Sequence, residues 1–426
     1  MKLLFSVVIH ASVVLAAAFV RRGDFQSPDA RRPQRVEPVN VALTTWLQGK
    51  TDLQWYGTIT VGTPPQNKVI FDTGSNSVLL PRSNCTSCGA HNLFNQSASS
   101  TFSPAPALPF NPVFGTGGTT LPLSPPQGAS CSVATDTISL GGGLRVPQQQ
   151  FLLCDAYGDA LASQPADGII GLGSAPASSF DGTSTFSTLY WGLVSSRQLP
   201  GPEFSFSYLP GQPQGSQLTL GGVDKNRFEG EVRTVRLDAE LTAATQSWVV
   251  GVRGVRIQGK GAESYGVRMV GVALVDTGTA FIMTPDFETA RDIYAKISGE
   301  IRPIDELGSW GAACSTLDRM ARDVTFVVGG GNTNGTYGGG SAEADVTVPK
   351  RFFNLGEYPG KPGVCQAMLL NPREPARDPI QQRPAWVLGS PAFKAYYTVW
   401  NGADMTIGFA KPATKGRREL MGANGI

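Results

Sequence analysis

The tripeptide Asp-Thr-Gly occurs twice in this 426-residue chain, at Asp72 and at Asp276, each time directly after an apolar segment (KVIF and VALV). An apolar β-strand that runs into Asp-Thr-Gly places a carboxylate on a tight turn, because glycine can adopt backbone conformations that a Cβ would forbid. One such turn can arise by chance as a simple loop. Two of them, 204 residues apart, predict two similar halves that each present one carboxylate to a shared site.

The composition favours many short strands and turns. Glycine (51 residues) and proline (31 residues) are abundant, and only 16% of the residues are charged. Short runs of Val, Ile, Leu, Phe and Thr lie between clusters of Gly, Pro, Asn and Ser, as in β-rich proteins. The chain is long enough to bury the cores of two or more domains. We therefore expect an all-β protein, mainly β with a few short helices.

Charge and metal-ligand content argue against two classes of partner. The net charge is +2, without a long basic run or a basic stripe interleaved with aromatic residues, so we expect no nucleic-acid partner. Two histidines and six cysteines without zinc-type spacing predict no metal site. The sequence also gives no reason to expect a cofactor or an oligomer, so we predict a monomer.

The N-terminus predicts the compartment. An apolar run from Leu3 to Val20 follows Met1-Lys2 and contains three alanines at 16–18, which is the pattern of a secretory signal peptide over residues 1–18. The alternative is a membrane anchor of about 20 apolar residues, but His10 interrupts the run. No later span of membrane length follows. We expect a protein without a membrane anchor that is secreted to the extracellular space, with a vacuole or another acidic compartment as an alternative.

The segments flanking the β-rich region lack periodicity. Residues 19–43 are polar and contain Arg and Pro, which predicts a short pro-segment or a disordered lead. Residues 413–426 are predicted to be a disordered tail. Sequons at Asn84, Asn95 and Asn334 are compatible with a glycoprotein.

Six ordered segments carry a family resemblance. They are YGTITVGTPPQ (56–66), FDTGSNS (71–77), FGTG (114–117), DGIIGLG (167–173), VDTGT (275–279) and AWVLGS (385–390). Together they resemble the pepsin-like aspartic proteases over most of the chain. The resemblance implies a bilobal fold with the active-site cleft between an N-terminal lobe (44–212) and a C-terminal lobe (213–412).

The same resemblance implies that Asp72 and Asp276 are catalytic. Two carboxylates within hydrogen-bonding distance cannot both ionise easily, so they share a proton and titrate as a pair. Such a pair can act as general base and general acid on one water molecule. Hydroxyls of Ser75 and Thr279 are expected to donate to the outer carboxylate oxygens. Thr73 and Thr277 match the family's buried threonines, which link the two turns. The full supporting set is Thr73, Gly74, Ser75, Thr277, Gly278 and Thr279.

The flap departs from the family pattern. The expected flap residues are Phe114, Gly115 and Thr116, where the family usually has tyrosine at the first position. Leu79 stands seven residues after Asp72, where the family usually has tryptophan. Both polar side chains of that pair are missing together. We therefore expect a flap that is held by apolar contact, with an altered efficiency or specificity.

The six cysteines predict disulfides in an oxidising compartment. Cys131 and Cys154 lie symmetrically about a Gly-Gly-Gly turn at 141–143, so an antiparallel hairpin would place them opposite each other. The resemblance implies a second-lobe bridge between Cys314 and Cys365. Cys85 and Cys88 can form a tight disulfide or a redox or metal pair, and we predict the disulfide.

The best helix candidate spans residues 285–297. Its apolar positions fall on one helical face, and Pro285 suits the start of a helix. These positions are Phe287, Ala290, Ile293, Tyr294 and Ile297.

The resulting prediction is a secreted aspartic endopeptidase that is made as a zymogen. The active enzyme is expected to hydrolyse protein or peptide substrates between bulky apolar residues at acidic pH. A non-catalytic relative that binds peptides through the same cleft is the first alternative, although neither aspartate is lost. A carbohydrate-binding β protein would leave the paired Asp-Thr-Gly motifs without an explanation.

Overall fold

The computed structural model describes residues 36–48, 51–62, 66–115, 119–121, 127–174, 176–179, 185–259, 264–267, 270–329 and 343–413. The predicted signal peptide, the beginning of the predicted lead, most of the predicted tail, Thr116 and Asn334 lie outside these residues. Residues 36–413 belong to one compact unit.

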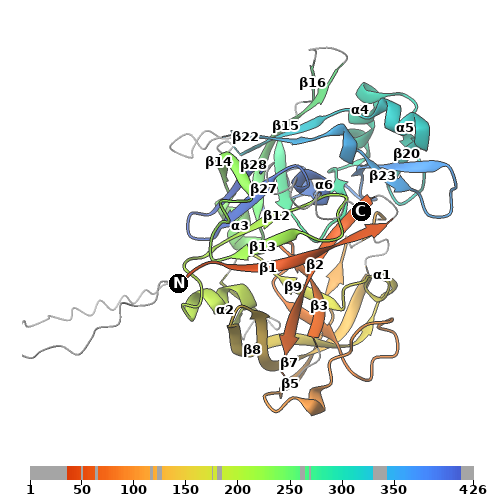
Figure 1. Cartoon of the computed structure of the whole chain (residues 1–426). Coiled ribbons are helices and arrows are strands. Elements are labelled where there is room, and N and C mark those ends of the chain that lie inside the picture. Colours follow the sequence, from red (N-terminus) through yellow and green to blue (C-terminus); the bar gives the residue numbers. More distant parts are fainter. Residues whose placement is uncertain are drawn as a thin grey trace, which may run out of the picture. The chain divides into compact units, whose positions relative to one another are not determined.

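Strands dominate the described part of the chain (Figure 1). The largest sheet has 14 strands. Its strands in spatial order are β14 (Phe228–Arg236), β28 (Thr406–Pro412), β27 (Tyr397–Asn401), β12 (Glu203–Ser207), β13 (Ser216–Leu220), β1 (Val39–Gln48), β2 (Thr51–Val61), β3 (Gln66–Asp72), β9 (Gly168–Gly171), β4 (Val78–Pro81), β8 (Leu144–Tyr157), β7 (Gln127–Gly141) and β5 (Ser103–Phe110), with β6 (Val113–Phe114) paired to β7.

The second half of the chain supplies two more sheets. An eight-stranded sheet runs β22 (Glu343–Val348), β21 (Val324–Gly329), β15 (Val249–Gln258), β17 (Gly271–Val275), β26 (Ala385–Leu388), β18 (Ile282–Met283) and β25 (Leu369–Leu370), with β16 (Ser264–Val267) paired to β15. A four-stranded sheet runs β19 (Arg302–Pro303), β20 (Trp310–Ala313), β24 (Val364–Ala367) and β23 (Asn354–Glu357). A separate hairpin pairs β10 (Ala177–Ser179) with β11 (Thr185–Ser187).

The two halves repeat one arrangement of strands around the Asp-Thr-Gly turns. In the first half, β3 pairs in parallel with β9, which pairs antiparallel with β4, and β4 pairs in parallel with β8. In the second half, β17, β26, β18 and β25 pair in the same way and in the same order. The prediction of two similar halves, and of a bilobal, mainly β fold, is confirmed.

Strand β1 begins inside the segment that was predicted as a lead. Residues 39–43 pair with β13, and the strand then pairs with β2. Val41 and Leu43 are buried, because alternate residues of a strand point to the same face. The disordered interpretation is therefore wrong for residues 39–43, whereas a pro-segment and the lobe boundary near residue 212 stay predictions.

The described helices are few and short. They are α1 (Asp159–Ala162), α2 (Leu189–Ser195), α3 (Ala239–Thr245), α4 (Phe287–Ile297), α5 (Cys314–Met320) and α6 (Ser390–Phe393), with 3-10 turns at Gln96–Ala98 and Lys350–Phe352. Among them, none is long and apolar enough to cross a membrane.

Helix α4 confirms the predicted helix with two differences at its start. Asp286 is the N-cap and accepts a hydrogen bond from the Thr289 amide at 2.9 Å, so Pro285 precedes the helix instead of opening it. Phe287 is 41% exposed, unlike the other four apolar positions, because the first turn extends beyond the core. Its ring still contacts the Trp310 ring, with centroids 5.3 Å apart.

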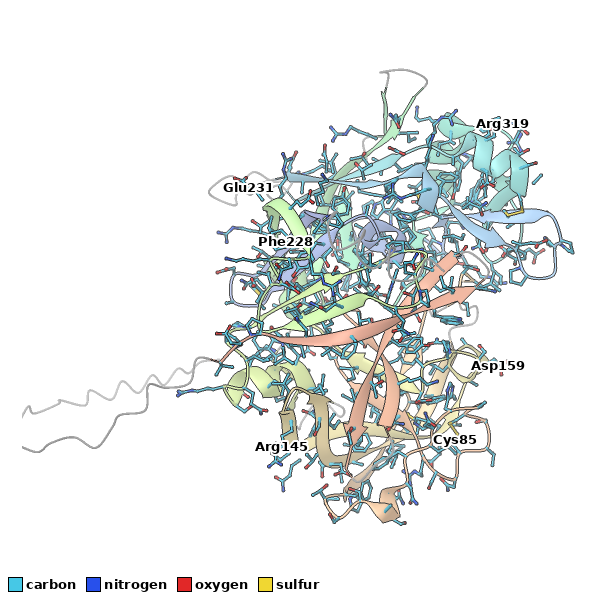
Figure 2. All side chains as sticks on the ribbon, viewed as in Figure 1. Cys85, Arg145, Asp159, Phe228, Glu231 and Arg319 are labelled. Atoms are coloured by element: carbon cyan, nitrogen blue, oxygen red, sulfur yellow. A yellow bond between two sulfur atoms is a disulfide. The ribbon has the colours of Figure 1, made fainter. Side chains whose placement is uncertain are left out.

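Buried aromatic side chains join the halves beneath the site. Phe204 of β12 stacks on Trp400 of β27, with ring centroids 5.8 Å apart, and Trp248 packs edge-on against both rings. Trp248 also donates its indole N–H to the Leu172 carbonyl at 2.7 Å. Nearer the surface, Phe228 of β14 (Figure 2) stacks on a tyrosine of β27.

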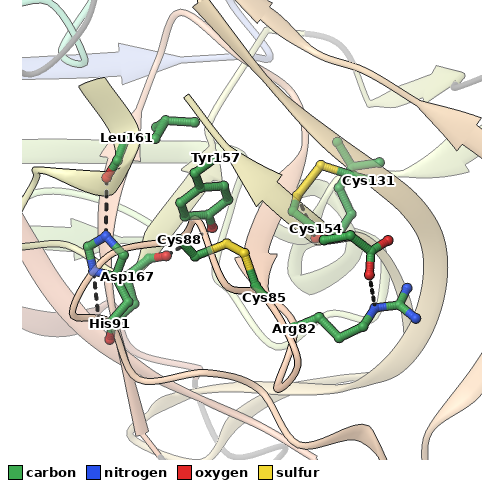
Figure 3. The surroundings of a disulfide bond; sticks show 11 residues. Arg82, Cys85, Cys88, His91, Cys131, Cys154, Tyr157, Leu161 and Asp167 are labelled. Carbon is green, nitrogen blue, oxygen red and sulfur yellow. Dashed lines mark hydrogen bonds and ion pairs between the residues drawn. A yellow bond between two sulfur atoms is a disulfide. The ribbon is translucent and has the colours of Figure 1, made fainter. Parts of the chain in front are cut away.

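All three predicted disulfides are confirmed, namely Cys85–Cys88, Cys131–Cys154 and Cys314–Cys365. Cys131 and Cys154 lie opposite each other in the β7–β8 register, as the symmetry about the glycine turn predicted. The tight pair and this cross-strand bridge lie near each other in Figure 3.

Candidate active site

The two aspartates lie together at the ends of equivalent strands. Asp72 is the last residue of β3, and Asp276 directly follows β17. Both are buried, and their carboxyl groups are hydrogen-bonded neighbours. The repeat therefore brings two carboxylates from residues 204 positions apart into direct contact.

The glycines are required here for a different reason than the sequence suggested. Neither Gly74 nor Gly278 has a positive φ. Instead, each glycine lies against the carboxylate of the other half: a Cβ on Gly74 would lie 2.6 Å from Asp276 Oδ1, and a Cβ on Gly278 would lie 2.5 Å from Asp72 Oδ1. Any larger residue would push the carboxylates apart, so close approach, not turn conformation, explains both glycines.

Each carboxylate receives a matching pair of hydrogen bonds. Asp72 Oδ1 accepts from the Gly74 amide at 2.8 Å, and its Oδ2 accepts from the Ser75 hydroxyl at 2.6 Å. Asp276 Oδ1 accepts from the Gly278 amide at 2.7 Å, and its Oδ2 accepts from the Thr279 hydroxyl at 2.6 Å. The hydroxyl contacts expected from the sequence are thus present, and both carboxyl groups have a fixed orientation.

Two buried threonines tie the turns to each other. Thr73 Oγ1 donates to the Val275 carbonyl at 2.9 Å and accepts from the Thr277 amide at 3.0 Å. Thr277 Oγ1 donates to the Phe71 carbonyl at 2.7 Å and accepts from the Thr73 amide at 3.0 Å. These four bonds form a two-fold arrangement that links the halves directly below the aspartates.

The pair favours a shared proton. Burial raises the pKa of Asp276 well above its usual range, and the charge of Asp72 and the hydrogen bond to it raise this pKa further. The hydrogen bonds from Thr279 and Gly278 lower it, but by less. The second carboxyl of the pair therefore loses its proton only well above the pH at which a solvated aspartate ionises.

This raised pKa predicts a loss of stability as the pH rises. Between about pH 4, where an unfolded aspartate ionises, and the raised pKa, the folded state binds more protons than the unfolded state. The contribution of this pair to the free energy of unfolding should be highest below about pH 4 and should decrease through that window. Urea denaturation over a pH series measures it.

Asp276→Asn removes the titrating group and supplies the comparison for this series. The stability of wild type relative to the variant should decrease as the pH increases above about 4. A difference that stays constant up to neutral pH would contradict the raised pKa of the pair.

One site contact escaped the sequence analysis. The buried Gln54 of β2 donates its side-chain amide to the carbonyl of Gly278, in the turn that carries Asp276. A polar residue within the apolar stretch LQWYG is the only local signal, and it does not identify the partner.

The segment predicted to form the flap contains β6, and its Phe114 makes apolar contacts. Phe114 pairs with Gln127 of β7 and packs, half-buried, against an apolar cluster that includes Leu79, Tyr157 and Ile169. Gly115 is exposed. The two residues that replace the family's polar pair therefore belong to one apolar cluster.

A buried polar network supports the same cluster (Figure 3). Tyr157 donates its hydroxyl to the Asp167 carbonyl at 3.0 Å, and His91 Nδ1 lies 3.5 Å from Asp167 Oδ1. Burial alone would raise the pKa of Asp167, but hydrogen bonds from His91, Asn92 and the Lys68 amide hold it below its usual value. The ionised Asp167 thereby ties residues 91–92, which follow the Cys85–Cys88 loop, to the start of β9.

Comparisons with known proteins agree with this geometry. The family described as "Eukaryotic aspartyl protease" matches residues 54–412. The chain is 27% identical to Pepsin-2B of Gadus morhua (87% of this chain, 100% of the relative) and 30% identical to Pepsin F of Oryctolagus cuniculus (85% and 82%). It is 28% identical to Cathepsin E of Mus musculus (87% and 82%). The chain therefore belongs to the eukaryotic aspartyl proteases, the pepsin-like aspartic endopeptidases.

Proposed function

We propose that Asp72 and Asp276 together activate a water molecule that hydrolyses peptide bonds in protein substrates. The observation that carries this proposal is the direct contact of two buried carboxyl groups, with the pKa of Asp276 raised by burial and by its partner. A pair with one proton contains a base and an acid at the same place, as hydrolysis of an amide requires.

In the proposed reaction, the ionised carboxylate takes a proton from water as the oxygen attacks the peptide carbonyl. The protonated carboxyl donates its proton to the carbonyl oxygen, which gives a neutral tetrahedral diol. The first carboxyl then gives its proton to the leaving nitrogen, while the other recovers a proton from the diol as the C–N bond breaks. The two carboxyl groups end with one proton between them, so the site is ready for another cycle.

The residues around the pair would keep it in position during this cycle. Ser75 and Thr279 hold the outer oxygens, and the glycine amides hold the others. Because these donors are already oriented, little reorganisation accompanies the proton transfers. Thr73 and Thr277 act through the backbone and are positioning residues.

The compartment and pH follow from separate features. A pair that needs one proton favours acidic pH, and three disulfides suit an oxidising compartment. With the predicted signal peptide, these features support secretion as a zymogen. The side chains of the sequons at Asn84 and Asn95 are exposed, as glycosylation requires. We also propose that the protein acts as a monomer without a membrane anchor.

The apolar flap favours one other candidate, a catalytically weak relative that binds peptides. Phe114 cannot donate the hydroxyl hydrogen bond of the usual tyrosine, and Leu79 offers no partner for it. Such a protein would bind the substrates of the first candidate and cleave them slowly or not at all.

An assay on acid-denatured globin decides between these candidates. The secreted protein is first freed of the residues that precede β1, which include most of the predicted pro-segment. It is then incubated at a series of acidic pH values with and without a statine-type inhibitor. We expect cleavage that the inhibitor abolishes, because its hydroxyl resembles the tetrahedral diol between the carboxyl groups. Inhibitor binding without inhibitor-sensitive cleavage at any pH would favour the peptide-binding relative.

A further inference from the structure

A polar contact joins the described part of the flap segment to the other half of the chain. Gln366 Nε2 donates a hydrogen bond to the Thr120 carbonyl at 2.7 Å, across 246 positions of sequence. Thr120 lies between β6 and β7, and Gln366 lies on β24. Thr120 is only 5% exposed and Gln366 only 1% exposed, so this bond is shielded from water.

The donor belongs to a firmly held strand. Gln366 pairs with Gly311 of β20, and its neighbour Cys365 forms the disulfide with Cys314. A carbonyl can only accept, so the side-chain amide must present its nitrogen to Thr120. The amide oxygen of Gln366 is buried and has no hydrogen-bond partner among the described residues. Among the described residues, the hydrogen bond to the Thr120 carbonyl is therefore the polar contact that this side-chain amide makes.

The first half holds the start of the flap segment through the two-residue pairing of β6 with β7 and one apolar side chain. Strand β6 has two residues, of which Val113 is 67% exposed and only Phe114 packs against the apolar cluster. Leu79 gives Phe114 no hydrogen-bonding partner. The buried hydrogen bond from the second half therefore adds a directional contact beyond the short β6–β7 pairing, at a residue that lies past the end of β6.

We propose that Gln366 is a positioning residue that orders the flap segment by holding Thr120, so that Phe114 is in place before a peptide binds. The inference rests on the proposed peptide hydrolysis for its functional consequence, but the tether itself is independent of catalysis. If the flap is already ordered, a bound peptide does not have to supply that ordering, and binding is tighter.

Gln366→Met tests the tether, because methionine keeps the length and packing of glutamine but cannot donate. Loss of one buried hydrogen bond should increase the opening of the flap about five- to tenfold. Hydrogen–deuterium exchange of residues 113–115 and 119–121 should accelerate by that factor. In the peptidase assay, KM should rise about as much while kcat changes little, since the lost contact orders the flap before chemistry.

Gln149→Met is the matched control. Gln149 is 3% exposed and also donates to a backbone carbonyl, that of Ser187, at 2.9 Å, but it lies on β8 away from the second half. It should change neither the exchange of the flap segment nor KM. Equal flap exchange in wild type, Gln366→Met and the control would overturn the proposal.

Gln366→Glu adds a readout that a purely structural role would not produce. A protonated glutamic acid can donate to the Thr120 carbonyl, whereas an ionised carboxylate repels it. Flap exchange in this variant should match wild type at acidic pH, where the carboxyl is protonated, and should approach the methionine variant once the pH exceeds the carboxyl's pKa, which burial raises above its usual value. The same exchange difference at every pH contradicts a hydrogen-bonded tether.

Exchange experiments in an Asp72→Asn background separate this inference from the proposed function. If Gln366→Met accelerates flap exchange in this background, while the wild-type protein shows no peptidase activity, the tether is supported and the proposed hydrolysis is contradicted. Normal peptidase activity with unchanged flap exchange would contradict the tether alone.

Discussion

Asp72→Asn and Asp276→Asn should each lower kcat/KM for peptide-bond hydrolysis by about a thousandfold or more, the upper range for loss of a general acid or base. An asparagine can neither take a proton from water nor pass one to the leaving nitrogen. The side-chain shape is kept, and the Gly74 and Gly278 amides still have an oxygen to donate to. Assays on denatured globin, with circular dichroism melting to confirm the fold, measure this effect.

The double variant should be hardly slower than either single variant, because the two carboxyl groups work as one unit and either loss disables both. Asp159→Asn is the control, since Asp159 is an exposed carboxylate at the start of α1 (Figure 2). It should leave kcat/KM unchanged. If both single active-site variants retain activity within about tenfold of wild type, where general acid–base catalysis should be lost, the proposed roles are wrong.

Thr277→Val should destabilise the protein by about 2–6 kcal/mol, because it leaves two buried backbone groups without a partner at about 1–3 kcal/mol each. These groups are the Phe71 carbonyl and the Thr73 amide. The volume of the side chain hardly changes, so packing does not explain such a loss. Urea denaturation at a fixed acidic pH measures the free energy of unfolding.

Thr277→Ser is the matched control for the hydroxyl. It keeps both hydrogen bonds and removes only a methyl group, which costs about 1 kcal/mol when buried. Hydrolysis should also slow in the valine variant, because the turn that carries Asp276 loses its link to the turn that carries Asp72. A valine variant as stable as the serine variant would show that the link contributes little.

The sequence alone determined the repeated part of this protein. Apolar segments that end in Asp-Thr-Gly are local signals, and they correctly predicted two equivalent strand arrangements around Asp72 and Asp276. The Cys131–Cys154 bridge was predictable for the same reason, because residues equidistant from a tight turn face each other in a hairpin. Helix α4 followed from its apolar periodicity, although capping by Asp286 moved its start.

The tertiary structure decided which distant groups meet. Gly74 and Gly278 are needed because each lies against the other half's carboxylate, a reason that no local pattern contains. The bonds from Gln54 to Gly278 and from Gln366 to Thr120 join residues more than 200 positions apart. Periodicity in a sequence encodes which face is buried, but not which partner covers it. The packing of the two halves alone specifies that partner, and with it the meeting of the two aspartates and the contact of Thr120 with Gln366.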